Sequence, residues 1–276
     1  MELWEYLEQV DRAYESLSGG ALEARIGALT EACGQEYGAE SASYASLLGE
    51  QGANYRGQGR YQESEDCFQR ALELLEKTAG KDSPAYATAL NNLASVHRLT
   101  GRYADAEREY AACLALYRRT VGTGDVLYAA GLNGLSMVYL DQNLLLQAAR
   151  LQTRAAEILD ALPQCRDELA VSLCNLGLLL RQMGRLREAE EKLKQAVALF
   201  EGELGTHTPH YHAALNGLGS VDYAAGRYRQ AQSRFRQAAQ AAEALYGPEH
   251  WECRVAREHM ELARRAAETA QQRKGG

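Results

Sequence analysis

The 276-residue chain has few of the residues that build β-sheets and few that interrupt helices. Val and Ile, which favour strands, are scarce, and only 4 residues are Pro. Ala, Leu, Glu, Arg and Gln dominate instead, and these are mostly good helix formers. The composition therefore predicts an all-α protein with long helices and little or no sheet.

A basic surface and a long apolar run are also absent from the sequence. The net charge is −7 and the pI is about 5.5, which argues against nucleic acid or an anionic membrane as a partner. The first residues, MELWEYLEQVDRAYE, do not place an apolar run after a basic segment. The densest apolar run, LCNLGLLL at 173–180, is too short to cross a bilayer. We therefore expect a cytoplasmic protein.

The sequence contains no recognisable catalytic, cofactor or metal motif. Its 6 cysteines include no CxxC pair, and HExxH, P-loop and GxSxG patterns are missing. One histidine cluster, THTPHYH, contains His207, His210 and His212, but Pro209 breaks its local geometry. We therefore predict a non-enzymatic protein without cofactor or metal, and the role of these histidines stays open.

What the chain does have is a repeat. The segment LNNLASVHRLTGRYADAE at 90–107 returns in altered form from Leu48, Leu132, Leu173 and Leu215. Its turn triplets begin at 59, 101, 143, 184 and 226, so successive copies are 42, 42, 41 and 42 residues apart. A fixed period of this length predicts a solenoid of stacked units.

Each copy has the spacing of a helical hairpin. In the second copy the first-helix positions lie at i, i+3, i+4 and i+7, namely Leu90, Leu93, Ala94 and His97. Gly101 interrupts this helix, and a second helical pattern follows at Tyr103, Ala106, Tyr110 and Cys113. One hairpin cannot bury both apolar faces, so the copies must stack on one another.

These residues resemble the tetratricopeptide repeat, in which Leu-Gly or Leu-Ala, then Gly-x-Tyr and a small crossing residue recur. The 42-residue period and the linker LGTHTP at 204–209 are similar to the longer variant found in kinesin light chains and bacterial proteins. The resemblance implies a right-handed superhelical solenoid of antiparallel helix pairs, with the first helices lining a concave groove. We expect a degenerate repeat at 1–43, five repeats at 44–252, and a capping helix with a frayed tail at 253–276.

Asparagines recur at groove-facing positions of the expected first helices. One column holds Asn91, Asn133 and Asn216, and the next holds Asn92 and Asn175. Asn is a mediocre residue inside a helix, but its carboxamide has two donors and an acceptor for a peptide backbone. Similar asparagines line the peptide groove in the resembling family. The alternative is that these side chains bridge neighbouring repeats.

Arginines and apolar residues complete the predicted groove. Arg56, Arg98 and Arg181 form a column that suits an acidic or C-terminal peptide, although each also suits a helix C-terminus. Apolar, aromatic and polar contacts come from Met137, Leu140, Ser220 and Tyr223. The turn arginines are expected to be solvated. At Asp222 we favour a shift of the helix over a pairing with Arg227, because an unpaired buried carboxylate is costly.

The sequence therefore predicts a protein-interaction scaffold that binds a short extended peptide or partner segment in its groove. Two alternatives remain: a peptide-sensing regulatory module that acts on another protein, and an oligomer that assembles through its own repeats.

Overall fold

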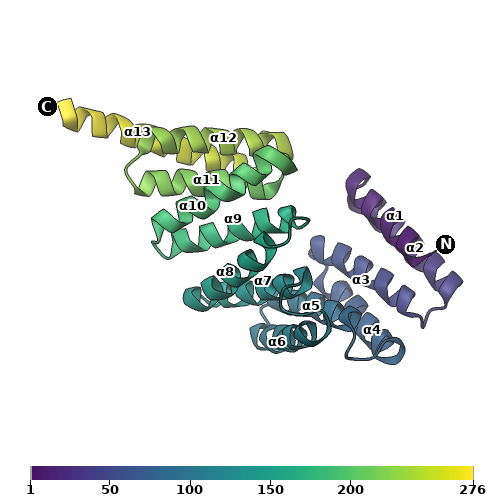
Figure 1. Ribbon diagram of the computed structural model, residues 1–276. Coiled ribbons are helices and arrows are strands. Elements are labelled where there is room, and N and C mark those ends of the chain that lie inside the picture. Colours follow the sequence, from purple (N-terminus) through teal and green to yellow (C-terminus); the bar gives the residue numbers. More distant parts are fainter. Residues whose placement is uncertain (1, 276) are drawn as a thin grey trace. The chain divides into compact units, whose positions relative to one another are not determined.

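The computed structural model describes residues 2–275, which form helices and contain no strand (Figure 1). The chain divides into two compact units, 1–144 and 145–276. The first unit contains α1 (Leu3–Ser16), α2 (Gly19–Tyr37), α3 (Ala42–Gly57), α4 (Tyr61–Thr78), α5 (Pro84–Leu99), α6 (Tyr103–Thr120) and α7 (Val126–Asp141). The second contains α8 (Leu145–Asp160), α9 (Arg166–Gln182), α10 (Leu186–Leu199), the π-helical turn η1 (Phe200–Leu204), α11 (Pro209–Ala224), α12 (Tyr228–Tyr246) and α13 (Trp251–Gly275). This all-α repeat arrangement confirms the predicted fold class.

The first helix of most repeats begins at a polar capping residue. Ser41, Ser83 and Thr208 each accept a hydrogen bond from the backbone N–H three residues later, at 3.1 to 3.2 Å. Asp125 accepts one from the N–H of Leu127 at 2.8 Å. These bonds satisfy N–H groups that have no carbonyl partner within the helix, which fixes where α3, α5, α7 and α11 start.

The turn inside each hairpin requires a left-handed backbone. Four repeats place Gly there with φ between 74° and 77°, while the third repeat places Asn143 there with φ 58°. Asn tolerates this conformation better than most residues. The third repeat therefore keeps the turn although its triplet is NLL rather than GRY.

Close packing inside the hairpins depends on small residues of the first helix. A Cβ atom added to Gly219 would lie 2.6 Å from the Phe235 ring, and one added to Gly177 would lie 2.6 Å from Leu193. The corresponding second-helix position in the third repeat holds Gln152, whose side-chain amide donates to Ser172 at 3.3 Å. The α8–α9 packing therefore contains a buried polar pair where other repeats use Phe, Tyr or Leu.

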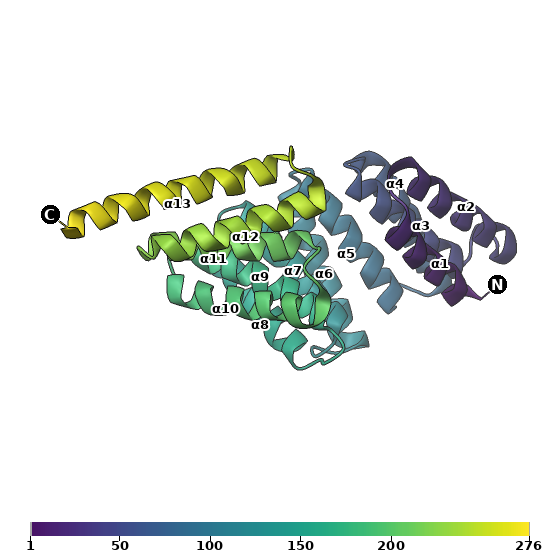
Figure 2. The same cartoon turned by 90° about the horizontal axis from the view of Figure 1, so that it is seen from above.

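The last helix runs alongside α12 in both views, and it continues to Gly275, which includes most of the tail that we expected to fray (Figures 1 and 2). Cys253, Ala256 and Ala263 are buried at 1% exposure or less, so α13 covers the apolar face of the preceding hairpin. Within residues 2–275 no helix is both long and apolar enough to cross a membrane.

Candidate functional site

The first helices of the repeats supply one face in each unit, which we call the first-helix face. In the first unit it consists of α3, α5 and α7, and in the second of α9, α11 and α13, because α13 packs where a further first helix would be. All the predicted site residues lie on these helices. The structure separates them into two groups with different environments.

In the first unit, Asn92 of the second asparagine column bridges neighbouring repeats through a hydrogen bond with Arg56. The Arg56 guanidinium donates from Nη1 to Asn92 Oδ1 at 3.3 Å and lies over the Phe68 ring, 5.8 Å from its centroid. Burial lowers the pKa of Arg56, although the group remains charged at neutral pH. Arg56 and Asn92 therefore already use part of their hydrogen-bonding capacity on each other.

Arg98 is likewise paired within the protein. Its Nη1 donates to Asp141 Oδ2 at 2.7 Å, which joins α5 to the end of α7. The side chains of Arg98 and Asp141 are only 18% and 28% exposed, so the pair is partly shielded from water. A carboxylate of a guest would have to compete with Asp141 at this position.

The remaining predicted residues of the first unit are partly buried. Asn91 has a buried carboxamide oxygen without a hydrogen-bond partner among the described residues. Asn133, Met137 and Leu140 follow one another along α7 and are each partly accessible. This stretch of the face is mainly amide and apolar, with its positive charge neutralised by Asp141.

In the second unit, three predicted residues converge on one hollow. Arg181, Ser220 and Tyr223 line a depression of about 300 Å³. The other lining residues are Phe235, His259 and Leu262. Arg181 forms no ion pair with any described residue, and Tyr223 and Leu262 are 40% and 53% exposed. The hollow thus combines an uncompensated cation with apolar and aromatic walls.

A second hollow lies on the same face, towards the N-terminal ends of α11 and α13. It measures about 320 Å³ and is lined by Leu178, Pro209, His210, His212, Ala213, Asn216, Trp251, Glu252 and Val255. The two hollows are separated by a hydrogen-bond pair in which His259 Nδ1 lies 3.2 Å from Asn216 Oδ1. Asn175, one turn from Leu178 on α9, is partly buried and lines neither hollow.

Two histidines, His210 and His212, line this second hollow. Burial lowers the pKa of His210, and burial lowers the pKa of His212 more than the nearby Glu252 carboxylate raises it. His212 Nδ1 lies 2.8 Å from Glu252 Oε2, but both ring nitrogens lack a well-aligned hydrogen bond among the described residues. His207 is exposed and lines neither hollow. No group of His, Cys, Asp and Glu within the described residues is arranged to hold a metal ion.

The structure corrects the expectation for Asp222. The helix does not shift: Asp222 is buried, and Arg227 donates from Nε to its Oδ1 at 2.7 Å. Arg227 also donates from Nη2 to Glu190 Oε2 of α10 at 2.7 Å. The pairing that we did not favour is therefore the one present, because the arginine satisfies the carboxylate without displacing α11.

The turn arginines also differ from the solvated residues that we expected. They are only half-exposed, and Arg60 and Arg102 pair with Glu23 and Glu65 of the preceding repeat at 2.7 and 2.9 Å. Arg185 pairs only with Glu188 of its own helix, because Ala149 takes the position of the distant glutamate. The ion pairs of Arg60 and Arg102 therefore link successive repeats away from the first-helix face.

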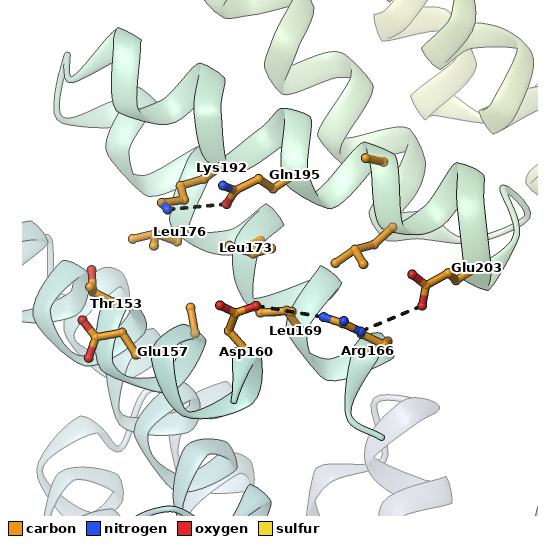
Figure 3. Close-up of a pocket in the computed structure, with 13 residues that line it drawn as sticks. Thr153, Glu157, Asp160, Arg166, Leu169, Leu173, Leu176, Lys192, Gln195 and Glu203 are labelled. Atoms are coloured by element: carbon orange, nitrogen blue, oxygen red, sulfur yellow. Dashed lines mark hydrogen bonds and ion pairs between the residues drawn. The ribbon is translucent and has the colours of Figure 1, made fainter. Parts of the chain in front are cut away.

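A larger hollow of the second unit lies elsewhere. It measures about 560 Å³ and opens between α8 and α10, over Leu169, Leu173 and Leu176 of α9 (Figure 3). At one end Arg166 extends between Asp160 and Glu203, at 4.0 and 3.9 Å (Figure 3). None of the predicted site residues lines it.

Helix α13, which the sequence predicts only as a cap, contributes to both hollows. Trp251 lines one of them, and His259 and Leu262 line the other. The repeat period could have indicated this contribution, because one further 42-residue step from Ser220 reaches Leu262 and the same step from Gly217 reaches His259. The period of the repeat therefore continues into the capping helix.

The helix pairs recur at a fixed period, and their first helices form an accessible face. No catalytic constellation is present among the described residues. These features define a helical-repeat scaffold. The family comparison agrees: the tetratricopeptide repeat model matches residues 43–119, 87–161, 127–202 and 168–244. The chain belongs to the tetratricopeptide repeat family, whose members bind protein partners. No curated protein matches the chain.

Solved structures share the fold at low sequence identity. A Podosopora anserina protein with kinesin light chain-like, nearly identical TPR-like repeats is 20% identical, with a TM-score of 0.61, over 75% of this chain and 99% of that one. BtubC (BKLC) from P. vanneervenii is 19% identical, with a TM-score of 0.63, over 89% and 91%. The apo form of RapI is 14% identical, with a TM-score of 0.61, over 87% of this chain and 64% of RapI.

Proposed function

We propose that this protein binds a short extended segment of a partner protein along its first-helix face. The observation that carries the proposal is the convergence of Arg181, Ser220 and Tyr223, which two neighbouring repeats contribute to one accessible hollow. A polar trough with apolar recesses suits an extended chain, because amides bind its backbone and recesses hold its side chains.

The two units contribute differently to this function. In the second unit, Arg181 has no acidic partner among the described residues and is exposed, so it is available to a carboxylate of the segment. In the first unit, Asp141 already neutralises Arg98 and Asn92 accepts from Arg56. We therefore expect the second unit to prefer segments with acidic groups, and the first unit to bind a segment through apolar and backbone contacts at Met137, Leu140 and Asn133.

The experiment selects a displayed library of random short peptides on the full chain and measures the affinity of enriched peptides by titration calorimetry. We expect Met137→Ala to weaken peptides bound by the first unit and Tyr223→Ala to weaken peptides bound by the second, each by roughly tenfold, because truncation of an anchoring contact costs about 1 to 2 kcal/mol. Arg187→Ala is the matched control, since Arg187 is exposed on α10 and forms no ion pair with the described residues. Enriched peptides whose affinity is insensitive to both first-helix variants would refute the proposal.

A further inference from the structure

The second unit presents two recesses, and the distance between them restricts the shape of the ligand. We call the hollow at His210 and His212 the first recess and the hollow at Arg181 the second recess. On α11 the first recess is lined by Ala213 and the second by Ser220, and on α13 the corresponding residues are Val255 and Leu262. Seven residues of helix span about 10.5 Å, so the recesses are about 10 to 13 Å apart along the helix axes.

An extended chain advances about 3.3 Å per residue, and alternate side chains point to opposite sides. Side chains i and i+2 share a side but are only about 7 Å apart, and side chain i+3 points away. Side chains i and i+4 share a side at about 13 Å. Only the last spacing allows one extended segment to fill both recesses.

The chemistry of the two recesses is different. The first is bordered by Leu178, Val255 and the exposed Trp251 ring. The Glu252 carboxylate also lines it, so it suits an apolar or aromatic side chain without negative charge. The second also has apolar walls, at Phe235 and Leu262, but the Arg181 guanidinium stands at its edge without a partner among the described residues. A carboxylate beside the second side chain would complement that charge.

The Asn216 side chain, which is hydrogen-bonded to His259, suits contact with a peptide backbone. Asn216 Oδ1 is occupied by His259, which leaves the Asn216 amide N–H groups without an acceptor among the described residues. Asn216 lines the first recess and lies between Ala213 and Ser220 on α11, so its amide is near the boundary of the two recesses. A backbone carbonyl midway between the two anchoring side chains would accept from them.

We propose that the second unit binds an extended segment that runs along α11, places two apolar side chains four residues apart in these recesses, and sets a carboxylate beside the second against Arg181. This inference rests on the proposed function and specifies the chemistry and register of the ligand. The axis along α11 distinguishes it from a segment that crosses the first helices from repeat to repeat.

The test compares enriched peptides from the library described above on the full chain and on two variants. On the unmodified protein we expect two apolar positions spaced by four, with Asp or Glu next to one of them. On Arg181→Gln the acidic preference should disappear and an acidic parent peptide should bind about fivefold to tenfold more weakly, since a charge-assisted hydrogen bond is lost. Arg187→Gln is the control and should leave both unchanged.

The first recess is tested by Trp251→Ala, with Trp4→Ala as the control, because both rings are more than half exposed and neither substitution empties the core. Synthetic parent peptides with the two apolar residues three or five apart should bind at least tenfold more weakly than the spacing of four. Ala213→Leu, which narrows the same recess, provides a second variant, and far-UV circular dichroism verifies that each variant is folded.

The outcomes separate this inference from the proposed function. Enriched peptides without the i, i+4 spacing, or binding that is unaffected by both Arg181→Gln and Trp251→Ala, would overturn the inference while leaving peptide binding to the first-helix face in place. Failure of the library to yield any binding peptide on the full chain would count against both.

Discussion

Arg227 lies at the end of the hairpin turn of the fifth repeat, and its replacement by Met tests how the structure accommodates a buried carboxylate. The Asp222 side chain is 11% exposed, and Arg227 Nε lies 2.7 Å from its Oδ1. Glu190 would keep Lys194 at 2.7 Å after the replacement, whereas Asp222 would lose its ion pair. The variant therefore isolates the cost of one unpaired buried carboxylate.

The expected loss follows from the burial of the pair. Breaking a fully buried ion pair costs about 3 to 5 kcal/mol, and the partial exposure of the Arg227 side chain reduces this, so we expect Arg227→Met to lower the free energy of unfolding by about 2 to 3 kcal/mol. Arg185→Met is the matched control, because Arg185 pairs only with the exposed Glu188 of its own helix. We expect that change to cost far less, because an exposed ion pair contributes little to stability.

Urea denaturation followed by far-UV circular dichroism measures both losses. Adding Asp222→Leu to Arg227→Met should restore most of the stability, because Leu180 fills the same position of the preceding repeat at 4% exposure. Equal losses for Arg227→Met and Arg185→Met, or no recovery in the double variant, would refute the reasoning.

Two further predictions concern packing and pH. Gly219→Ala should lower the free energy of unfolding by about 1 to 2 kcal/mol, because its Cβ would lie 2.6 Å from the Phe235 ring. A Cβ added at Gly49 meets nothing within 4 Å, so Gly49→Ala should instead raise the free energy of unfolding by roughly 0.5 to 1 kcal/mol. Because burial lowers the pKa of His212, the unfolded chain binds more protons than the folded one as the pH falls below about 6.5, and stability decreases there. Urea titrations at about pH 7.5 and about pH 5.5 should show a smaller decrease for His212→Gln than for the unmodified chain, and an equal decrease would contradict the assignment.

Much of the architecture was readable from the sequence because it depends on local interactions. The i, i+3, i+4, i+7 pattern at Leu90, Leu93, Ala94 and His97 specifies a helix within one copy, and the recurring turn specifies where the chain reverses. Even the NLL turn could be placed by the period alone, and Asn143 takes the same backbone conformation as the glycines. The sequence also predicted Arg181, Ser220 and Tyr223 as groove-facing positions, and in the structure all three line one hollow.

The partners of charged residues could not be read in the same way. Whether Arg98 faces a guest or Asp141 depends on two side chains 43 residues apart, and the choice between a shifted helix and an Arg227–Asp222 pair depends on where α10 and α11 place their side chains. A column of identical residues gives each member the same direction but not the same neighbours. By itself the sequence determined the repeat and its helices, because helix periodicity fixes these. The tertiary structure alone decided that Arg98 has a carboxylate partner among the described residues and Arg181 has none, because such ion pairs form between repeats that only stacking brings together.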